Sequence, residues 1–425
     1  MPNGSIVFKY TLAVAATVLL ALLTLNLSLG DKQIDKRFAK LYTVSNPQFA
    51  RTMSVILGPS LTPGNKVQEL VNGDEIFPAM LDSIRRARHT ITFETYIFWS
   101  GSIGKEFVAA LTERARSGVR VHILLDWIGG QLDDALLAEL ENNGVEVRRY
   151  NRPRWYNLHL LNNRTHRKLL VIDGVTGYTG GVGIADHWRG NGQSPAQWRD
   201  THFKVLGPVV GQMQSAFIDN WMQATGEVLH GEAYFPSLDH AGHHSAQVFT
   251  SSPGGGAESM QLMYLLSITS AAQSIQLSAS YFVPDTVAVN SLIAAAARGV
   301  KVQIILPGEH LDWAIVRHAS RATWGRLLRA GVEIYEYQPS MYHVKIMIVD
   351  GLWVSVGSTN IDARSFAIND EANLNIYDAR FAQRQTEVFR QDLGDSRRVT
   401  LTEWESRPFS DKALDFGAAL LSSQL

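Results

Sequence analysis

Apolar residues in most of this chain follow two patterns, short runs that are apolar on both faces of a strand and longer stretches with apolar residues three or four apart. The runs VHILL and VQIIL are apolar on both faces, as expected for strands buried between two layers of helices. Phe107, Val108 and Leu111 recur at helical spacing, and Gly118 follows them where a helix would end. These patterns predict the alternating strands and helices of an α/β fold.

The order of these elements is repeated in the second half of the chain. Five segments have a counterpart in the same order, namely 89–98 with 273–283, 104–118 with 290–299, 118–126 with 299–307, 144–150 with 331–337, and 165–174 with 342–351. Such βαβ units predict a mixed sheet flanked by helices in each half. The duplication predicts two lobes that face each other across a pseudo-twofold axis, with one active site where they meet.

The duplication also sets the expected domain boundaries. We expect an N-terminal segment at 1–55, a first lobe at 56–235, a linker rich in Gly, Pro, Ser and His at 236–258, and a second lobe with a C-terminal tail at 259–425. A chain of 425 residues exceeds the size at which one hydrophobic core usually stops growing, which agrees with two lobes.

The N-terminal segment has a different character from the lobes. Residues 10–30 carry no charge, and a helix of about 20 apolar residues is long enough to span a bilayer. We therefore expect a single-pass transmembrane anchor in the cell membrane, and a cleaved signal peptide or a buried helix are the alternatives. Lys9 alone precedes the apolar stretch and several basic residues follow it, which favours a cytoplasmic location for the lobes.

Composition narrows the classes of function. Thirty-nine Lys and Arg residues balance 40 Asp and Glu residues, so the excess of basic residues that is typical of general nucleic-acid binders is absent. The chain has no cysteine, which excludes disulfides, zinc sites built from thiolates and a cysteine nucleophile. A local basic patch is still compatible with this composition.

The strongest chemical signal is the pattern H-x-K-x-x-x-x-D, which occurs once in each copy of the repeat. The first match is His166, Lys168 and Asp173, and the second is His343, Lys345 and Asp350. Chance rarely places two such matches at equivalent positions. The alternative is a structural strand copied by the duplication, but the neighbouring apolar residues differ between the copies while the His, Lys and Asp residues are the same.

The spacing suggests a role for each residue type. Positions i and i+2 of a strand point to the same side, so each histidine should lie beside its lysine. Each Asp is followed by Gly, which indicates a turn or a salt bridge rather than direct participation. Two imidazoles and two ammonium groups suit exchange at a phosphodiester, in which one histidine attacks phosphorus and the other protonates the leaving alcohol. The lysines would hold the phosphate oxygens, and neither a metal nor another cofactor is required.

These motifs resemble those of the phospholipase D superfamily, and within it the bacterial cardiolipin synthases. In that family each motif is followed by small polar residues, which Ser358 and Asn360 match in the second copy. In the first copy Gly181 matches, but Gly183 replaces the usual Asn. The resemblance covers about residues 65–405 and implies two phospholipase D-like lobes, with Gly181, Ser358 and Asn360 at the substrate phosphate.

The resemblance also implies an acidic residue that orients each histidine. Glu371 lies at the matching distance after His343, and Asp200 takes the corresponding place after His166. An ordinary carboxylate at the edge of a strand is the alternative for both. Glu94 is a further inward-facing carboxylate for which a structural role is at least as reasonable.

The resemblance implies a cardiolipin synthase that transfers a phosphatidyl group between two phosphatidylglycerol molecules through a phosphohistidine and releases glycerol. A phospholipase D that uses water as acceptor would need the same residues, since the choice of acceptor depends on how well the site excludes water. A nuclease is disfavoured by the balanced charge and the apolar N-terminal segment. A non-catalytic lipid-binding protein is the reading from another class, and only Gly183 favours it. The sequence leaves the oligomeric state and the identity of the attacking histidine open.

Overall fold

A computed structural model describes residues 4–27, 34, 36, 38–39, 42–153, 162–253 and 257–424. In the first half of the chain its elements are α1 (Gly4–Leu27), α2 (Pro47–Ile56), β1 (Thr62–Val71), α3 (Asn72–Arg85), β2 (Thr90–Thr95), α4 (Ser102–Arg116), β3 (Arg120–Asp126), α5 (Asp134–Asn142), β4 (Glu146–Tyr150), β5 (Leu169–Ile172), β6 (Thr176–Gly180), the short helix η2 (Asp186–Trp188), β7 (Trp198–Arg199), β8 (Thr201–Leu206) and α6 (Val210–Thr225). In the second half they are β9 (His244–Ser251), α7 (Ala257–Ser270), β10 (Ser274–Ala279), α8 (Thr286–Ala297), β11 (Lys301–Pro307), α9 (Ala314–Arg329), β12 (Glu333–Tyr337), β13 (Met341–Tyr342), β14 (Lys345–Val349), β15 (Trp353–Gly357), α10 (Ala363–Ala367), β16 (Glu371–Tyr377), α11 (Ala379–Gly394), β17 (Ser396–Val399), α12 (Leu401–Glu405) and α13 (Phe409–Ala419).

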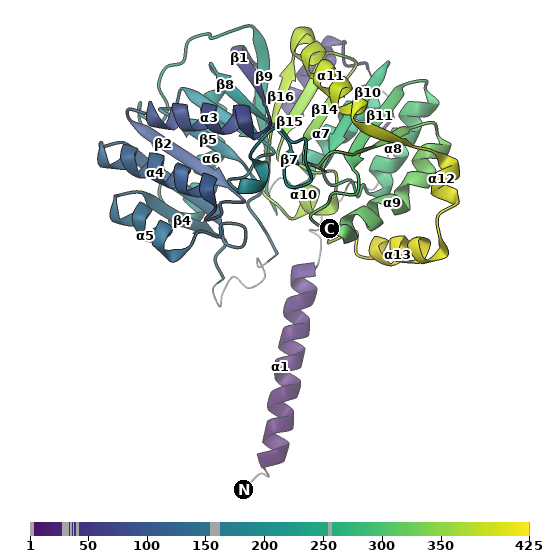
Figure 1. The fold of residues 1–425 in the computed structure, drawn as a ribbon, viewed down its shortest axis with the longest axis horizontal. Helices are drawn as coiled ribbons and strands as arrows, with labels where there is room; N and C mark the ends of the chain where they lie inside the picture. The colour runs from purple at the N-terminus through teal and green to yellow at the C-terminus, as the bar shows by residue number, and fades with distance from the viewer. Residues whose placement is uncertain are drawn as a thin grey trace.

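One mixed sheet runs through both halves of the body (Figure 1). Within the described residues it has 15 strands, in the order β17-β12-β11-β10-β14-β15-β16-β9-β1-β8-β6-β5-β2-β3-β4. Read outward from the centre, β1-β8-β6-β5-β2-β3-β4 and β9-β16-β15-β14-β10-β11-β12 have the same connectivity, so the predicted duplication is confirmed. Antiparallel pairing of β1 with β9, with Asn65 opposite His244, fuses the two halves into one sheet.

The central strand β9 lies inside the segment 236–258 that the sequence predicts as a linker. Ala246 and Val248 of β9 are buried in a core cluster that contains residues of both halves. Most residues of that segment are polar or small, so the short apolar run within it gives only a weak signal for a strand. Part of the predicted N-terminal segment 1–55 belongs to the folded body, because Val44 and Phe49 pack in the core of the second half.

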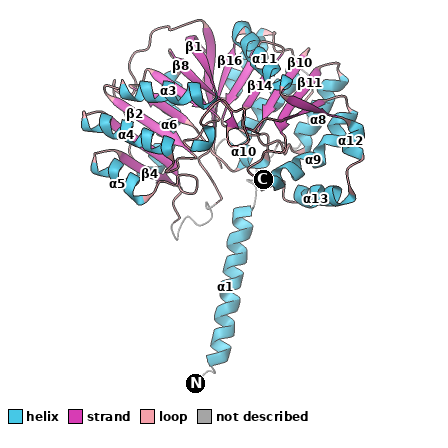
Figure 2. Cartoon of the chain, in the orientation of Figure 1, coloured by secondary structure: helices cyan, strands magenta, loops and turns pink. Residues whose placement is uncertain are grey.

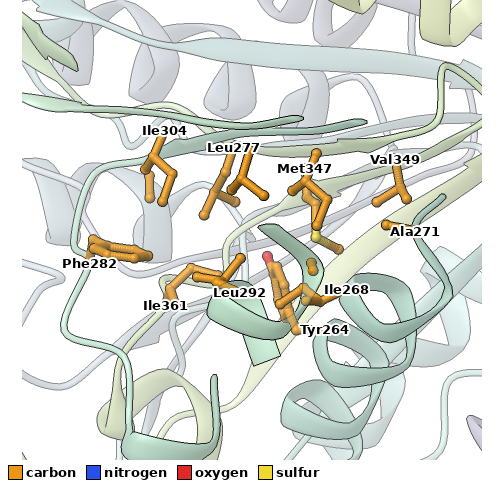
Figure 3. Packing of buried hydrophobic residues seen from close by; sticks show 14 of the residues in the cluster. Tyr264, Ile268, Ala271, Leu277, Phe282, Leu292, Ile304, Met347, Val349 and Ile361 are labelled. Atoms are coloured by element: carbon orange, nitrogen blue, oxygen red, sulfur yellow. The ribbon is translucent and has the colours of Figure 1, made fainter. Parts of the chain in front are cut away.

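Helices cover both faces of the sheet, as the doubly apolar strands predict (Figure 2). In β3, Ile123 packs with residues of α3, α4 and α5, whereas its neighbour Leu124 packs with residues of α6 on the other face. Figure 3 shows the corresponding packing in the second half, where Leu277, Ile304 and Met347 of the strands meet Leu292 of α8. The expected cap at Gly118 is present, because its φ of 92° is a left-handed conformation that glycine adopts without strain.

The N-terminal apolar stretch forms the single long helix α1, which extends away from the body (Figure 1). Its large apolar side chains are exposed, among them Phe8, Leu12, Val14, Leu19 and Leu20. Across the part of the chain that the structure describes, no helix is both long and apolar enough to cross a membrane, so the predicted transmembrane anchor is not confirmed.

Candidate active site

The two His–Lys motifs lie at equivalent places on the sheet, directly before or at the start of β5 and β14, which occupy the same position in the two halves. His166 and Lys168 precede β5, and Lys345 is the first residue of β14. The chain that leads into each motif pairs with the other half of the molecule. Met341–Tyr342 pairs in parallel with Trp198–Arg199, and Thr165 forms a bridge with Asp370. The motifs are therefore held by backbone contacts that cross between the halves.

Backbone hydrogen bonds fix each histidine in this crossed arrangement. The amide of His166 donates to the carbonyl of Asp370 at 2.9 Å, and the amide of His343 donates to the carbonyl of Arg199 at 2.8 Å. Asp370 and Arg199 each immediately precede an acidic residue, Glu371 and Asp200. The same bonds that position the histidines thus bring the carboxylate of the opposite half to each imidazole.

The carboxylates accept hydrogen bonds from the histidines in crossed pairs. His166 Nδ1 lies 2.9 and 3.0 Å from the two carboxylate oxygens of Glu371. His343 Nδ1 lies 2.7 Å from Oδ2 of Asp200. An ionised carboxylate only accepts, so Nδ1 carries the proton and Nε2 is left with its lone pair. Sequence order places each acid after the histidine of its own half, whereas the structure pairs each acid with the histidine of the other half.

The lysines lie beside their histidines, as the i, i+2 spacing predicts. Lys168 Nζ donates to the carbonyl of His166 at 2.8 Å, and Lys345 Nζ donates to the carbonyl of His343 at 3.0 Å. Lys345 Nζ also lies 3.2 Å from the ring nitrogens of His343 and 2.6 Å from Ser280 Oγ. All four side chains are buried, so their charges act through a medium that screens them poorly.

Burial and mutual charge set the protonation of this cluster. Burial lowers the pKa of His166 to about 4 even though Glu371 favours the protonated ring. Burial and the Lys345 charge lower the pKa of His343 to about 3. The two motifs interact electrostatically, because Lys345 contributes to the lowered pKa of His166 and Lys168 contributes to the lowered pKa of His343. The two half-sites therefore form one electrostatic unit.

The remaining members of the cluster respond to the same environment. Burial lowers the pKa of Lys168 to about 7 and that of Lys345 to about 8. Burial alone would raise the pKa of Glu371, but the interaction with His166 outweighs it and the pKa falls to about 2. Burial of Asp200 is likewise outweighed by His343, so its pKa is lowered. Two neutral imidazoles therefore face two ionised carboxylates.

The motif aspartates lie in turns and hold the backbone rather than the reacting groups. The carboxylate of Asp173 accepts from the backbone amides of Arg88, His89 and Thr90, and that of Asp350 accepts from those of residues 272–274. Both aspartates have positive φ, 53° and 52°, and each is followed by a glycine that also has positive φ, as in a type I′ turn. As members of the H-x-K-x-x-x-x-D motifs, Asp173 and Asp350 are candidate catalytic residues, but the structure places both in the turns that the following glycines indicate.

The small residues after the motifs are placed differently from one another. Ser358 Oγ is buried and donates to an oxygen of Glu371 at 2.5 Å, so it supports the carboxylate instead of facing a substrate. Gly181 leaves room for the acid of its half, because a Cβ there would lie 2.3 Å from Asp200 Oδ1. Asn360 Oδ1 accepts from Ser280 Oγ at 2.7 Å, and Ser280 in turn contacts Lys345. The side chain of Asn360 is therefore linked to the motif lysine Lys345 through Ser280.

Sequence reasoning missed the aromatic lining of the site. The Tyr96 ring packs edge-on against the His166 ring with centroids 5.3 Å apart, and Lys168 Nζ lies 5.8 Å from the centre of the Tyr96 ring. The Trp188 and Trp198 rings flank His343 at centroid distances of 5.3 and 5.2 Å. An alignment of the two copies makes Tyr96 and Ser280 equivalent positions. Tyr96 lies beside Lys168, and Ser280 lies beside Lys345.

No cluster of three or more His, Asp or Glu side chains in the described parts of the chain is arranged to hold a metal ion. Comparison with known proteins gives the family of the chain. The family model described as "Cardiolipin synthase, PLD-like domain" matches residues 80–192 and 264–393, which contain both motifs. The chain belongs to this family.

Curated cardiolipin synthases match most of the chain. The chain is 35% identical over 360 residues to the cardiolipin synthase of Geobacillus thermodenitrificans, which covers 84% of this chain and 72% of that protein. It is 35% identical over 366 residues to the major cardiolipin synthase ClsA of Bacillus subtilis, covering 85% of this chain and 76% of the relative. The resemblance that the two motifs indicate is therefore confirmed.

Solved structures share the fold of this cardiolipin synthase family member. Phosphatidylserine synthase from Haemophilus influenzae superposes with a TM-score of 0.67 at 14% identity, over 89% of this chain and 100% of that one. Polyphosphate kinase from Porphyromonas gingivalis gives a TM-score of 0.54 at 11% identity, over 91% of this chain and 56% of the other. These similarities establish the phospholipase D-like architecture alone.

Proposed function

We propose that this protein is a cardiolipin synthase. It would transfer the phosphatidyl group of one phosphatidylglycerol to the glycerol hydroxyl of a second and release glycerol. The observation that carries the proposal is the pair of buried His–Lys units, each with its imidazole held at Nδ1 by a carboxylate of the other half. This arrangement leaves Nε2 of each histidine available, and the two atoms would act on one phosphate in a two-step exchange.

The first step forms a covalent intermediate. Nε2 of one histidine attacks phosphorus, a P–N bond forms, and the bond from phosphorus to the glycerol oxygen breaks. The second histidine gives its proton to that oxygen, so glycerol leaves as a neutral alcohol. Burial lowers the pKa of His166 and His343, so both rings are neutral before substrate binds. The bound phosphate anion would raise the pKa of the second histidine, which then takes up a proton from solvent before it acts as the acid.

The second step reverses these roles. The glycerol hydroxyl of a second phosphatidylglycerol gives its proton to the now neutral second histidine. The new P–O bond forms while the P–N bond breaks, and this yields cardiolipin and the free enzyme. Lys168 and Lys345 would hold the non-bridging phosphate oxygens through both steps, and the anion would raise their pKa values above the lowered values of the empty site.

Membrane attachment follows from the substrate and from α1. Phosphatidylglycerol is a bilayer lipid, and α1 exposes a continuous set of apolar side chains that water solvates poorly. We propose that α1 holds the enzyme at the cell membrane, with the catalytic body on the cytoplasmic side as the basic residues after the apolar stretch favour. Extraction of membranes with alkaline carbonate tests the attachment, and release of all the protein would contradict it.

The decisive experiment is incubation of the full chain in vesicles with phosphatidylglycerol, followed by measurement of lipid products and released glycerol. Equal amounts of cardiolipin and glycerol are expected. Phosphatidic acid with glycerol would identify a phospholipase D that uses water, and neither product despite substrate binding would identify a lipid-binding protein. His166→Ala and His343→Ala should each abolish glycerol release, while His230→Ala, which changes an exposed histidine outside the site, should not.

A further inference from the structure

The C-terminal helix α13 has its polar and apolar faces reversed. A surface helix normally buries an apolar stripe and exposes charge. In α13, Phe409, Ala413, Phe416 and the C-cap Leu420 follow the spacing i, i+4, i+7 and i+11, and all four are exposed. The exposed fractions of Phe409, Phe416 and Leu420 are 86%, 70% and 70%. We call these four residues the α13 apolar face.

Ion pairs hold the opposite face of α13 against the body. Asp415 is buried and lies 2.6 Å from Arg407 and 2.7 Å from His318, while Asp411 lies 3.3 Å from Arg321. Ala418 completes the contact in a small cluster with Val316 of α9. Ion pairs thus hold α13 against the body, and its large apolar residues remain exposed and available to bind another surface.

The chain that follows the α13 apolar face contacts residues near the candidate active site in sequence. The chain after α13 returns to the site, where Gln424 contacts Asn162, four residues before His166, and Arg364 of α10. Arg364 also binds Asn162 through its side chain and carbonyl, at 2.9 and 2.8 Å. The segment that carries the apolar face is thus tied to the loops beside both motifs.

A second contact links this side of the body to the reacting groups. Trp313 precedes α9, the helix on which α13 packs, and its exposed fraction is 61%. It lines a cavity of about 20 Å³ together with Ser280, whose hydroxyl contacts Lys345. A tryptophan at the rim of such a cavity is suited to the boundary between water and lipid headgroups.

We propose that the α13 apolar face, with Trp313 at its side, docks the catalytic body onto a phospholipid bilayer. Helices with aromatic and leucine side chains on one face lie in the interface of a bilayer and bury that face in the acyl region. Figure 1 shows α13 and the C-terminus on the side of the body from which α1 extends. The inference rests on the proposed function for its reason to reach lipid, but the contact itself can be tested separately.

A site-specific probe tests the contact. The chain has no cysteine, so Phe416→Cys gives a single attachment point for a fluorophore in the full-length protein. Gln383→Cys is the control, since it is an exposed position on α11, at the end of the body away from α13 in Figure 1. In phosphatidylglycerol vesicles whose acyl chains carry bromine, we expect strong quenching at 416 and little at 383. Equal quenching at both positions, or none at 416, would overturn the proposal.

The same probe separates the bilayer from a second copy of the chain as the occupant. A spectral shift at 416 that appears without vesicles and grows with protein concentration would assign the face to self-association and overturn docking to lipid. We expect no such shift. This measurement needs no turnover, so it decides the docking even if the proposed reaction is wrong.

Turnover tests the consequence for catalysis. Serine at Phe409, Phe416 and Leu420 should lower cardiolipin formation from vesicles by at least about tenfold. With dihexanoyl phosphatidylglycerol below its micelle concentration, the same triple variant should match the wild type within about twofold. Unchanged turnover on vesicles, or an equal loss on both substrates, would contradict a docking role. Failure of the wild type on both substrates would instead contradict the proposed function.

Discussion

Glu371 and Asp200 decide which ring nitrogen of each motif histidine can react. Each carboxylate accepts the Nδ1 proton, and this fixes the tautomer in which Nε2 has its lone pair. Glu371 is itself held by the hydroxyls of Ser358 and Ser365 at 2.5 and 2.7 Å, and Asp200 by the indole N–H of Trp188 at 3.0 Å. The orientation of each imidazole therefore depends also on the side chains that hold its carboxylate.

The crossed pairing predicts a specific energetic coupling. Glu371→Gln and His166→Ala should be non-additive in the free energy of unfolding, with a coupling of about 1–3 kcal/mol, because both remove the same contact. Glu371→Gln and His343→Ala should add within about 0.5 kcal/mol. Chemical unfolding of the single and double variants measures both terms. Coupling with His343 in place of His166 would contradict the crossed arrangement.

Glu371→Gln also has an expected kinetic effect. An amide can donate to Nδ1 and stabilise the wrong tautomer, so kcat should fall by about 10- to 100-fold. The KM for phosphatidylglycerol should change little, because Glu371 is fully buried behind the ring. A large rise in KM with unchanged kcat would show that Glu371 acts on binding instead.

Glu94 gives a prediction that does not depend on the reaction. It is fully buried, Asn220 donates to its Oε1 at 2.7 Å, and its Oε2 has no partner, so burial raises its pKa to about 7. The unfolded carboxyl ionises near 4.5, so ionisation favours the unfolded state as pH rises from 4.5 to 7. Relative to Glu94→Gln, the wild type should lose up to about 3 kcal/mol of stability over this window. Parallel stability curves for the two proteins would contradict the raised pKa.

At the level of elements, the asymmetry between the two copies lies in the strands beside each lysine. Backbone bonds from Asp173 to Thr90 and from Asp350 to Ser274 align β2 with β10, so Tyr96 and Ser280 are equivalent. The half with Ser280 has Asn360, and the half with Tyr96 has Gly183. Lys345 thus donates to the hydroxyl of Ser280, whereas Lys168 lies over the aromatic ring of Tyr96.

Gly183 is a requirement of packing rather than a lost polar residue. A Cβ at this position would lie 2.8 Å from Ile97 Cβ and 3.2 Å from the Trp188 ring. Gly183→Asn should therefore destabilise the protein by about 1–3 kcal/mol and should not raise activity. Thermal unfolding with a turnover assay checks both. Asn360→Gly is the matched control, because it removes a side chain and creates no overlap. Higher activity in Gly183→Asn would contradict the packing argument.

Much of this architecture could be predicted from periodicity and repetition. The apolar runs at β3 and β11, the helical spacing of Phe107 and Leu111, and the Asp-Gly turns are local signals that survive in a single sequence. The sequence predicts a linker at β9 because its few apolar residues lie among polar ones, and its pairing with β1 and β16 shows that it is a central strand. Sequence order predicts that each acid serves the histidine of its own half, because it carries no information about which half a carboxylate reaches.

The whole molecule behaves as one catalytic unit because both its sheet and its site cross the middle. The β1–β9 pairing continues the sheet, and Arg384 and Gln385 of α11 bind Glu69 of β1. Arg199 of the first half forms a buried ion pair with Asp392 of the second half at 2.8 Å. Neither half holds a complete His–carboxylate pair.

Separated halves should therefore be inactive. Fragments 42–235 and 236–425 should each fail to release glycerol from phosphatidylglycerol, because His166 loses Glu371 and His343 loses Asp200. Co-expression of the two fragments should restore part of the turnover through the β1–β9 edge. The measurement is glycerol release by each fragment and by the co-expressed pair. Activity in one fragment alone would contradict a shared site.

The fusion of both halves in one chain has a consequence for how such a site can diversify. In a symmetric dimer of identical subunits, any substitution beside one lysine would appear beside the other as well. A single polypeptide is free of that constraint, so Tyr96 can stand on one side while Ser280 stands on the other. The donor and acceptor lipids can then contact different side chains within one active site. Two identical subunits related by symmetry would present the same side chains to both lipids.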